Sequence, residues 1–167
     1  MNDITKNTQE HIFKQWISEF KPLLFKIVRV YADNLEDEND LFQEMVIQIW
    51  KSVLNFKEQS SVHTWIYRVA LNTSIKWSTR NKSQHHIELT EDILLLSPTE
   101  QENANLEWLY NEISKLDTVD KSLTLLMLDG FSYKEMANIL GISTSNVGVK
   151  INRIKTHLQE KSKAITS

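Results

Sequence analysis

Helix-breaking residues are scarce in this chain, and that scarcity limits its possible folds more than any other feature. The 167 residues include three glycines and two prolines, too few for the many tight turns of a sheet protein. Few segments alternate apolar and polar residues, whereas apolar residues recur at a helical period over long stretches. The sequence therefore predicts an all-α chain.

Composition excludes several kinds of site. The chain has no cysteine, which removes disulfides, thiolate metal sites and cysteine nucleophiles. No apolar run approaches the ~18 residues that span a membrane, and the opening MNDITKNTQE lacks the apolar core of a signal peptide. We therefore expect a soluble cytoplasmic protein with no cofactor and no bound metal.

The helical pattern divides the chain into two small helical domains, residues 1–82 and 105–167, joined by an acidic linker at residues 83–104. The first domain is large enough for a modest hydrophobic core of its own. We expect three or four helices in it, because Pro22 marks a break in the first apolar period. The linker lacks a sustained helical period and has one short apolar patch, residues 93–96, that could dock elsewhere.

The next helix of the first domain has a polar start. It follows the stretch DNLEDEND, and either Asn39 or Asp40 could cap its amino end. Acidic side chains there would lie favourably at the positive end of the helix dipole. The apolar positions predict one buried stripe on this helix: Phe42, Met45, Val46, Ile49 and Val53.

Charge is distributed unevenly along the chain, although its net value is only -3. Residues 57–85 carry five basic side chains and one acidic one, and residues 121–167 carry seven and three. Residues 86–120 between them carry one basic and nine acidic side chains. Two basic blocks separated by an acidic one fit a protein that touches a polyanion at two places.

The first basic block contains the helix-forming stretch SVHTWIYRVALNTSIKWSTR, residues 61–80. One flank is apolar enough to bury against another helix. The neighbouring stripe combines a ring that can stack, an amide that can bond to a base edge and cations about one turn apart. Its members are Trp65, Arg68, Asn72, Lys76 and Thr79. The alternative is a half-buried core tryptophan beside a solvated cationic face.

The second basic block contains a helix-turn-helix pattern, SYKEMANILGISTSNVGVKINRIKTHL. A capping box begins at Ser132, Gly141 supplies a left-handed turn residue, and Ser143 or Thr144 caps the second helix. The outer face of that helix carries short polar and cationic groups suited to a major groove. Its members are Ser145, Val149, Asn152, Arg153 and Thr156, and it is flanked by Asn146 and Lys150. Such a pattern can also be a plain packing unit. Gly148 argues against the helix-turn-helix pattern, because it lies inside the second helix, where glycine costs about 1 kcal/mol relative to alanine.

Three stretches in this order resemble the extracytoplasmic-function group of sigma-70 RNA polymerase sigma factors. They are DLFQEMVIQIW at residues 40–50, the segment from Phe56 to Asn72, and the helix-turn-helix. The first resembles the segment by which these factors grip a coiled coil of the largest polymerase subunit. The resemblance therefore implies four residues that bind core polymerase: Asp40, Leu41, Gln43 and Glu44.

The resemblance also implies how the two basic blocks touch DNA. Residues 57–63 would form a loop that holds a flipped base of the minus-ten element, and capture of that base favours melting without ATP or a catalytic group. The implied contacts are His63, Thr64, Trp65, Arg68, Asn72 and Lys76. The outer face of the helix-turn-helix would bind the minus-thirty-five element. The implied function is that of a sigma factor, not an enzyme, and the resemblance also allows for an anti-sigma partner.

Several positions depart from the family pattern. A glycine is common at position 58, a larger ring at 62, a Leu-Pro pair at 116–117, and basic or hydroxyl side chains at 148 and 149. This chain instead has Glu58, Val62, Leu116 with Asp117, Gly148 and Val149. The shape of the pocket loop and the reading of the minus-thirty-five element are therefore open.

Three other functions compete with this reading. An enzyme is disfavoured because no HExxH, P-loop or GxSxG motif occurs and His85 and His86 lie in a polar linker. A one-component regulator would bind a small molecule through residues 1–80 and a palindromic duplex as a dimer. A pure interaction module fits poorly with two basic blocks.

Overall fold

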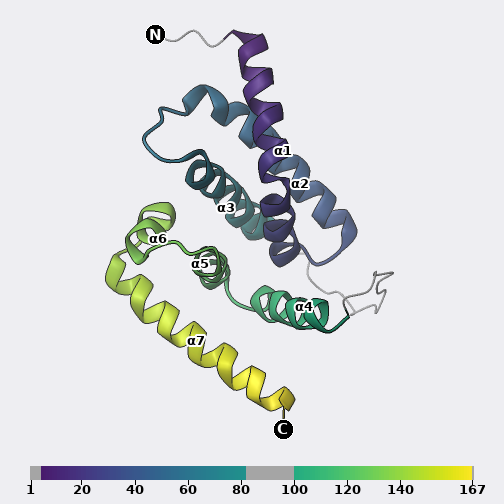
Figure 1. Cartoon of the computed structure of the whole chain (residues 1–167), viewed down its shortest axis with the longest axis vertical. Coiled ribbons are helices and arrows are strands. Elements are labelled where there is room, and N and C mark those ends of the chain that lie inside the picture. The colour runs from purple at the N-terminus through teal and green to yellow at the C-terminus, as the bar shows by residue number, and fades with distance from the viewer. Residues whose placement is uncertain (1–4, 82–99, 167) are drawn as a thin grey trace.

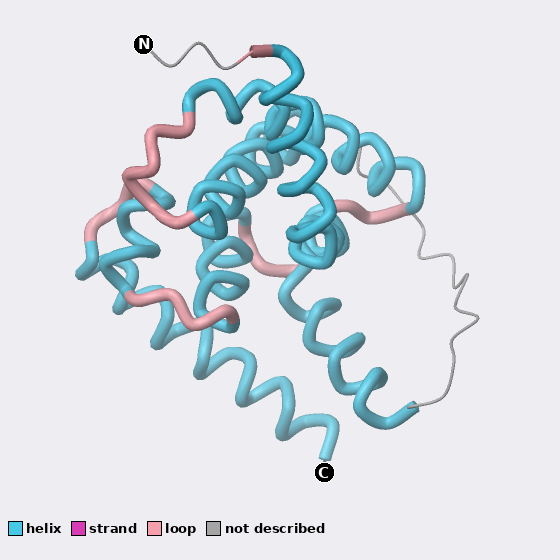
Figure 2. The backbone as a smooth tube through the Cα atoms, turned by 45° about the horizontal axis from the view of Figure 1, so that its top comes forward, coloured by secondary structure: helices cyan, strands magenta, loops and turns pink. Residues whose placement is uncertain are grey.

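Every regular element in the part of the chain that the structure describes, residues 5–81 and 100–166, is a helix (Figures 1 and 2). This computed structural model therefore confirms the all-α class. The elements are α1 (Lys6–Tyr31), α2 (Leu35–Ser52), the short 3-10 helix η1 (Val53–Asn55), α3 (Val62–Asn81), α4 (Glu100–Ser114), α5 (Thr118–Leu128), α6 (Tyr133–Leu140) and α7 (Thr144–Thr166).

The helix α1 runs unbroken through Pro22, so the break expected there is wrong. Pro22 lies on the exposed side of the helix. Trp16 before it and Leu24 and Ile27 after it are buried in the same core. A proline inside a helix costs about 3 kcal/mol, and the apolar face that continues on both sides of Pro22 outweighs that cost.

The start of α2 was also predicted too late. Asn34 is the N-cap, with its side-chain oxygen accepting from the Asp37 backbone N at 2.9 Å, so neither Asn39 nor Asp40 caps the helix. The first turn nevertheless carries three acidic residues, which is the expected match to the helix dipole. The helix therefore begins more than a turn earlier than the sequence analysis suggests. Its local cap and acidic first turn account for this start, because none of residues 35–40 is buried.

Helices α1, α2 and α3 pack on one another and form the first unit. The predicted apolar flank of α3 is confirmed, because Ile66, Ala70 and Trp77 are buried. In the predicted stripe of α2, Met45, Ile49 and Val53 are buried and Phe42 packs against the core from a half-buried position.

Helices α4 to α7, which follow the linker, are called the second unit (Figure 1). Helices α5, α6 and α7 pack on one another, whereas α4 packs mainly on α1 and also touches α5. Helix α4 starts at Glu100, so the predicted linker at 83–104 ends in helix. The rest of that linker, with its apolar patch, lies outside the described residues.

The predicted helix-turn-helix is confirmed in its local signals. Ser132 and Glu135 form a complete capping box at the start of α6, and Gly141 ends the helix with φ of 69°. Of the two candidate caps of α7, Ser143 accepts from the Asn146 backbone N at 3.1 Å. The inner stripe of α7, Val147, Ile151 and Ile154, is buried.

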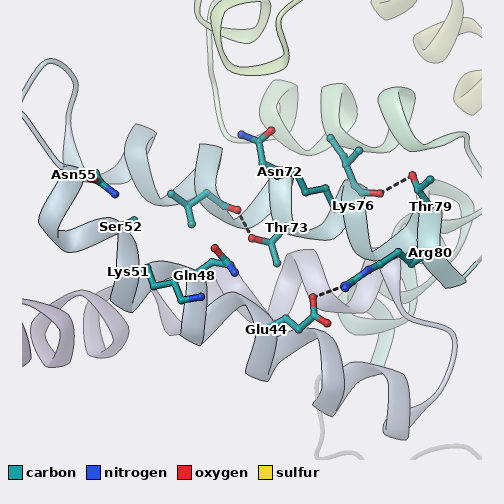
Figure 3. Close-up of a pocket in the computed structure, with 12 residues that line it drawn as sticks. Glu44, Gln48, Lys51, Ser52, Asn55, Asn72, Thr73, Lys76, Thr79 and Arg80 are labelled. Atoms are coloured by element: carbon teal, nitrogen blue, oxygen red, sulfur yellow. Dashed lines mark hydrogen bonds and ion pairs between the residues drawn. The ribbon is translucent and has the colours of Figure 1, made fainter.

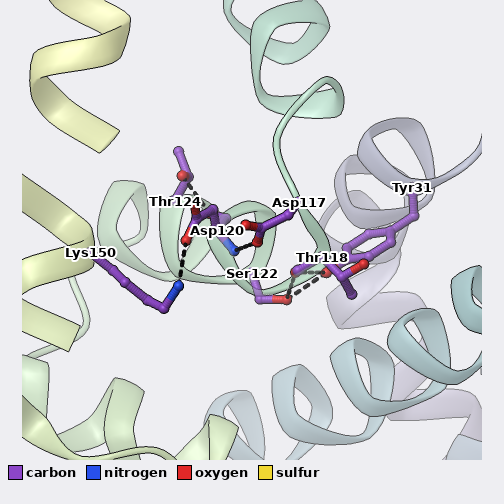
Figure 4. Close-up of polar contacts among 7 residues, drawn as sticks. All are labelled: Tyr31, Asp117, Thr118, Asp120, Ser122, Thr124 and Lys150. Carbon is purple, nitrogen blue, oxygen red and sulfur yellow. Dashed lines mark hydrogen bonds and ion pairs between the residues drawn. The ribbon is translucent and has the colours of Figure 1, made fainter. Parts of the chain in front are cut away.

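The two units pack against each other, with α5 between them. The Tyr31 hydroxyl of α1 donates to the Thr118 carbonyl at 2.9 Å and lies 2.5 Å from the Ser122 hydroxyl (Figure 4). On the other side of α5, the Lys150 ammonium of α7 lies 3.4 Å from an Asp120 carboxylate oxygen. Buried apolar residues of both units belong to one hydrophobic cluster. The described helices of both units therefore pack around one shared hydrophobic core, which we call the closed arrangement.

Candidate nucleic-acid interface

A cleft of about 600 Å³ opens beside the loop that the sequence predicts as a base pocket. It is bordered by that loop, by the start of α3 and by one face of α6. Its lining residues are Asn55, Phe56, Lys57, Gln59, Ser60, Ser61, Thr64, Trp65, Arg68, Glu135, Asn138 and Ile139. Two cations and two aromatic rings line the cleft, a combination that suits a nucleic-acid strand.

The loop beside this cleft turns through a left-handed residue. Glu58 has φ of 55°, and among the described residues it is the one non-glycine with a positive φ. This conformation costs a residue with a Cβ roughly 1–2 kcal/mol. The positive φ explains why the family pattern favours glycine at this position. The loop of this chain makes the same left-handed turn with Glu58.

Trp65 combines a packing role with a place in the cleft. Its indole Nε1 donates to the Ser52 hydroxyl at 3.2 Å, and its ring lies 5.6 Å from that of Phe56. The side chain is half-buried. The half-buried ring therefore ties α3 to α2 and also lines the cleft, while its stacking on DNA stays a prediction.

Arg68 and His63 lie on different sides of α3. The Arg68 guanidinium borders the cleft and donates to the Asn138 carbonyl of α6 at 3.0 Å. The exposed His63 stacks on Phe20 at 5.8 Å and lies 5.4 Å from the Phe131 ring, away from the cleft lining. Of the predicted minus-ten residues, the cleft thus brings Thr64, Trp65 and Arg68 together and leaves His63 outside.

A second opening, about 670 Å³ in volume, runs between α2 and α3 (Figure 3). Asn72 and Lys76 are exposed there, and Arg80 closes one end through a 2.6 Å ion pair with Glu44. The groove lining comprises Glu44, Gln48, Lys51, Ser52, Asn55, Val69, Asn72, Thr73, Ile75, Lys76, Thr79 and Arg80. Asn55 lines both this groove and the cleft, so the two openings are adjacent.

Several polar lining residues were missed in the sequence. Gln48 and Lys51 come from α2, and Asn55 comes from η1. They face the stripe of α3 only because α2 and α3 pack side by side. No local sequence pattern indicates that α2 and α3 pack side by side. The helical phase of α2 relative to α3 is the signal that could have identified Gln48, Lys51 and Asn55 as lining residues.

The predicted polymerase-binding residues divide into exposed and buried ones. Asp40 and Gln43 are exposed, and Glu44 is half-buried beside Arg80. Leu41 has no exposed surface at all because it packs in the core of the first unit. The exposed apolar side chain on α2 nearest to these residues in sequence is instead Ile47, which is 51% exposed.

The predicted minus-thirty-five residues lie on the outer face of α7 with one exception. Ser145, Asn146, Asn152 and Arg153 are exposed, and Val149 is 64% exposed. Lys150 points to the other side, where it pairs with Asp120 and retains 19% of its side-chain exposure. Five of the six residues therefore share one surface, and Lys150 helps to hold α7 on α5.

Gly148 lies against the ring of Tyr133 on α6. A Cβ added at position 148 would lie 3.6 Å from the Tyr133 Cε2 atom, which is an ordinary contact distance. Packing inside the protein therefore does not require glycine here, and nothing else in the structure explains it.

The described residues hold no group of three or more His, Cys, Asp or Glu side chains placed to bind a metal ion. None of their helices is long and apolar enough to cross a membrane. Two tyrosine hydroxyls are strongly perturbed. Burial raises the pKa of Tyr31 far above its ordinary value, and burial, followed by hydrogen bonding to Asp129, does the same to the pKa of Tyr67. Tyr67 is therefore a neutral donor inside the closed arrangement.

Both halves of the chain match sigma-70 family models. Residues 16–84 match Sigma-70 region 2, and residues 106–158 match Sigma-70, region 4. The chain belongs to the sigma-70 family. Region 2 covers α2, the groove and the side of the cleft formed by residues 55–68. Region 4 covers the helix-turn-helix, whose α6 lines the other side of the cleft. As a sigma factor, the chain acts in promoter recognition and transcription initiation.

Curated relatives place this sigma factor in the extracytoplasmic-function group. It is 26% identical to RNA polymerase sigma factor YlaC of Bacillus subtilis, over 93% of this chain and 92% of the relative. It is 27% identical to the ECF RNA polymerase sigma-E factor of Haemophilus influenzae, over 89% of this chain and 86% of the relative.

Solved structures share the fold. The sigma factor RpoE, in complex with the anti-sigma factor NepR from Bartonella quintana, has a TM-score of 0.71 at 20% identity, covering 90% of this chain and 96% of that one. CnrH, in complex with the cytosolic domain of CnrY, has a TM-score of 0.66 at 19% identity, covering 93% and 90%.

Proposed function

We propose that this sigma factor divides its work between its two units. Residues 1–82 bind core polymerase and open the minus-ten element, residues 83–104 connect the units, and residues 105–167 bind the minus-thirty-five element as duplex. The proposal is supported by the order of the two matched regions and by the position of each cationic surface within them.

Polymerase binding is assigned to the exposed face of α2. Asp40 and Gln43 would fix the register of the contact, and Ile47 would supply the apolar area that is desolvated. Leu41 supports this face from within the core. Glu44 has a mixed role, because its pair with Arg80 joins the polymerase face to the end of the DNA groove.

Promoter opening is assigned to the cleft and the groove together. A base unstacked from the duplex would enter the cleft beside Trp65, while the following nucleotides would pass Asn55 toward Asn72 and Lys76. Stacking on an aromatic side chain is worth about 1–3 kcal/mol per base, comparable to the cost of removing one base from the stack. Capture of the base therefore stabilises the open promoter without any catalytic group.

Duplex recognition is assigned to the outer face of α7. Asn146, Asn152 and Arg153 can hydrogen-bond base edges or phosphates in a major groove. Val149 has no hydrogen-bonding group, so the base feature that it can distinguish is the methyl group of thymine. We therefore assign to Val149 a contact with a thymine methyl in the minus-thirty-five element.

An anti-sigma factor is included among the proposed partners, together with core polymerase and promoter DNA. Both structural neighbours named above were solved in complex with another protein, and one of those proteins is an anti-sigma factor. A partner of this kind would have to leave the promoter surfaces of this chain before transcription starts.

The observation that carries the proposal is the cationic, aromatic cleft at the start of α3, inside the part of the chain that matches region 2. The experiment is footprinting on a promoter with core polymerase present. We expect protection of the upstream element and permanganate-reactive thymines at the downstream element. Protection of a palindromic duplex by the chain alone, with no reactive thymines when polymerase is added, would contradict the proposal and favour a one-component regulator.

A further inference from the structure

The Trp65 ring in the cleft is held from two directions. Its indole Nε1 donates to the Ser52 hydroxyl of α2 at 3.2 Å, and its ring lies 5.6 Å from the Phe56 ring, tilted by 51°. The Phe56 ring in turn meets the ring of the buried Trp16 of α1 edge-on at 5.4 Å. One hydrogen bond and a chain of aromatic contacts that ends in the core therefore restrain the indole.

The Ser52 hydroxyl has already committed its proton to another group. Ser52 is the last residue of α2, it is buried, and its hydroxyl donates to the Ile49 carbonyl at 2.8 Å. A serine hydroxyl has one proton to donate and two lone pairs that can accept. Because the proton points to Ile49, the oxygen accepts from the indole N–H of Trp65. The bond between α2 and α3 thus has a fixed donor and a fixed acceptor.

A second buried serine shows what is special about Ser52. Ser74 of α3 has no exposed surface, and its hydroxyl donates to the Ala70 carbonyl at 2.8 Å, much as Ser52 donates to Ile49. Ser52 also accepts a bond from a ring that lines the cleft. Ser74 is therefore a matched control that separates a buried helix hydroxyl from a hydroxyl that holds a ring.

The orientation of the indole decides what the cleft can offer to a base. Stacking uses the face of a ring, and the side-chain torsions of tryptophan allow several orientations. Trp65 is half-buried, so water can satisfy its N–H in another orientation once the Ser52 bond is gone. A ring that is already restrained loses less conformational freedom when a base stacks on it, and the base is bound more tightly for that reason.

We propose that Ser52 is a positioning residue for promoter opening, because its hydroxyl holds the Trp65 indole in the orientation that stacks on an unstacked base. Ser52 borders the groove between α2 and α3 (Figure 3), whereas Trp65 lines the cleft, so Ser52 acts on the cleft through Trp65. The consequence for DNA rests on the proposed function, whereas the positioning of the indole does not.

The first test examines the indole in the full chain without DNA or polymerase. In nuclear magnetic resonance spectra of isotope-labelled protein, the indole N–H signal of Trp65 is the one that disappears in Trp65→Phe. We expect Ser52→Ala to shift this signal and to make its hydrogen exchange with water about fivefold faster, the factor that one ordinary hydrogen bond contributes. Ser74→Ala should leave both unchanged. An unchanged Trp65 signal in Ser52→Ala would overturn the positioning role.

Circular dichroism identifies any variant that has lost helix. If Ser52→Ala is such a variant, Ser52→Cys takes its place in both tests, because a thiol keeps the approximate size of the side chain but is only a weak acceptor.

The second test is a double-mutant cycle on a promoter that the wild-type chain opens with core polymerase. We expect Ser52→Ala to slow opening about fivefold while binding of the closed promoter stays the same, and Ser74→Ala to change neither. Trp65→Phe keeps a ring but removes the N–H donor. Adding Ser52→Ala to it should therefore slow opening no further. Losses that multiply in the double variant would overturn the action of Ser52 through Trp65.

The proposed function and the positioning role fail in different ways. If the wild-type chain opens no promoter with core polymerase, the proposed function fails, and the indole signal still decides whether Ser52 holds Trp65. If promoters open and the indole signal responds to Ser52→Ala, an unchanged opening rate in that variant would overturn the role of Ser52 in opening.

Discussion

The two surfaces of this sigma factor that we propose bind DNA differ in how many contacts they make with the rest of the chain. At the cleft, Arg68 donates to a carbonyl of α6 and Trp65 is tied to Ser52. On the outer face of α7, Arg153 and Val149 are exposed. The surface proposed to bind duplex is therefore exposed at these two residues, whereas the surface proposed to bind the opened strand is partly engaged by the chain's own contacts.

The largest effect is expected at the strand-capturing surface. Asn72→Ala should lower promoter opening by about 10- to 100-fold, because an amide paired with a base edge contributes about 1–3 kcal/mol. Binding of the closed promoter should change little, since Asn72 acts only on the exposed strand. Stopped-flow fluorescence separates promoter binding from promoter opening. Asn111→Ala, which changes an exposed asparagine of α4, is the matched control. Equal losses at both steps would contradict the role.

Arg153→Ala should affect the other surface and the earlier step. We expect roughly tenfold weaker binding to the upstream duplex, with the slope of log affinity against log salt reduced by about 1 if Arg153 contacts a phosphate. Lys161→Ala, farther along the same exposed stretch of α7, serves as the control. Unchanged upstream protection in footprinting would remove Arg153 from the interface.

A smaller effect is expected at Val149, where recognition of a base would depend on an apolar contact and not on a hydrogen bond. Replacing each upstream thymine in turn with deoxyuridine removes only a methyl group. One such replacement should weaken wild-type binding about threefold, near the ~0.8 kcal/mol of one buried CH₂ group. Val149→Ala should be insensitive to the same replacement. Equal sensitivity in both proteins would show that Val149 does not touch that methyl group.

A substitution at Gly148 tests whether glycine is needed there for packing inside the protein or for close approach of DNA. Gly148→Ala should raise the free energy of unfolding by about 1 kcal/mol, because the added Cβ meets Tyr133 only at an ordinary distance. Urea denaturation measures the gain. Upstream duplex affinity measured on the same variant then shows whether close approach of DNA is the reason for glycine. A loss of stability would contradict the packing described for this position.

Glu58 is the opposite case, at the cleft. Glu58→Gly should be more stable than Glu58→Ala by about 1 kcal/mol, because only glycine adopts a positive φ without cost. Thermal unfolding of the two variants measures the difference. Equal stability would indicate that the loop does not hold its left-handed turn in solution.

Local signals in the sequence predicted the second unit well. The capping box at Ser132, the left-handed Gly141 and the inner stripe of α7 depend on residues within a few positions of one another. The helical state of the elements and the apolar flank of α3 were predictable for the same reason. The break at Pro22 was wrong because packing on both sides of it is a tertiary effect.

Other differences involve partners far apart in sequence. Leu41 and Ile47 look equally apolar in the sequence, and only the packing of α2 shows that the first is buried and the second exposed. Lys150 flanks the outer face by spacing, yet Asp120, thirty residues earlier, pairs with it on the inner side. Contact between Lys26 and Asp129, 103 residues apart, has no signal in a single sequence.

The most direct test of the central claim is transcription by purified core polymerase, with and without this chain, on a library of genomic fragments, followed by sequencing of the transcript starts. The account predicts starts that depend on the chain and share two short upstream elements. It also predicts that Asn72→Ala loses these starts while upstream protection remains. Failure to direct any start across compatible core polymerases, together with tight binding of the chain alone to a palindromic duplex, would contradict it.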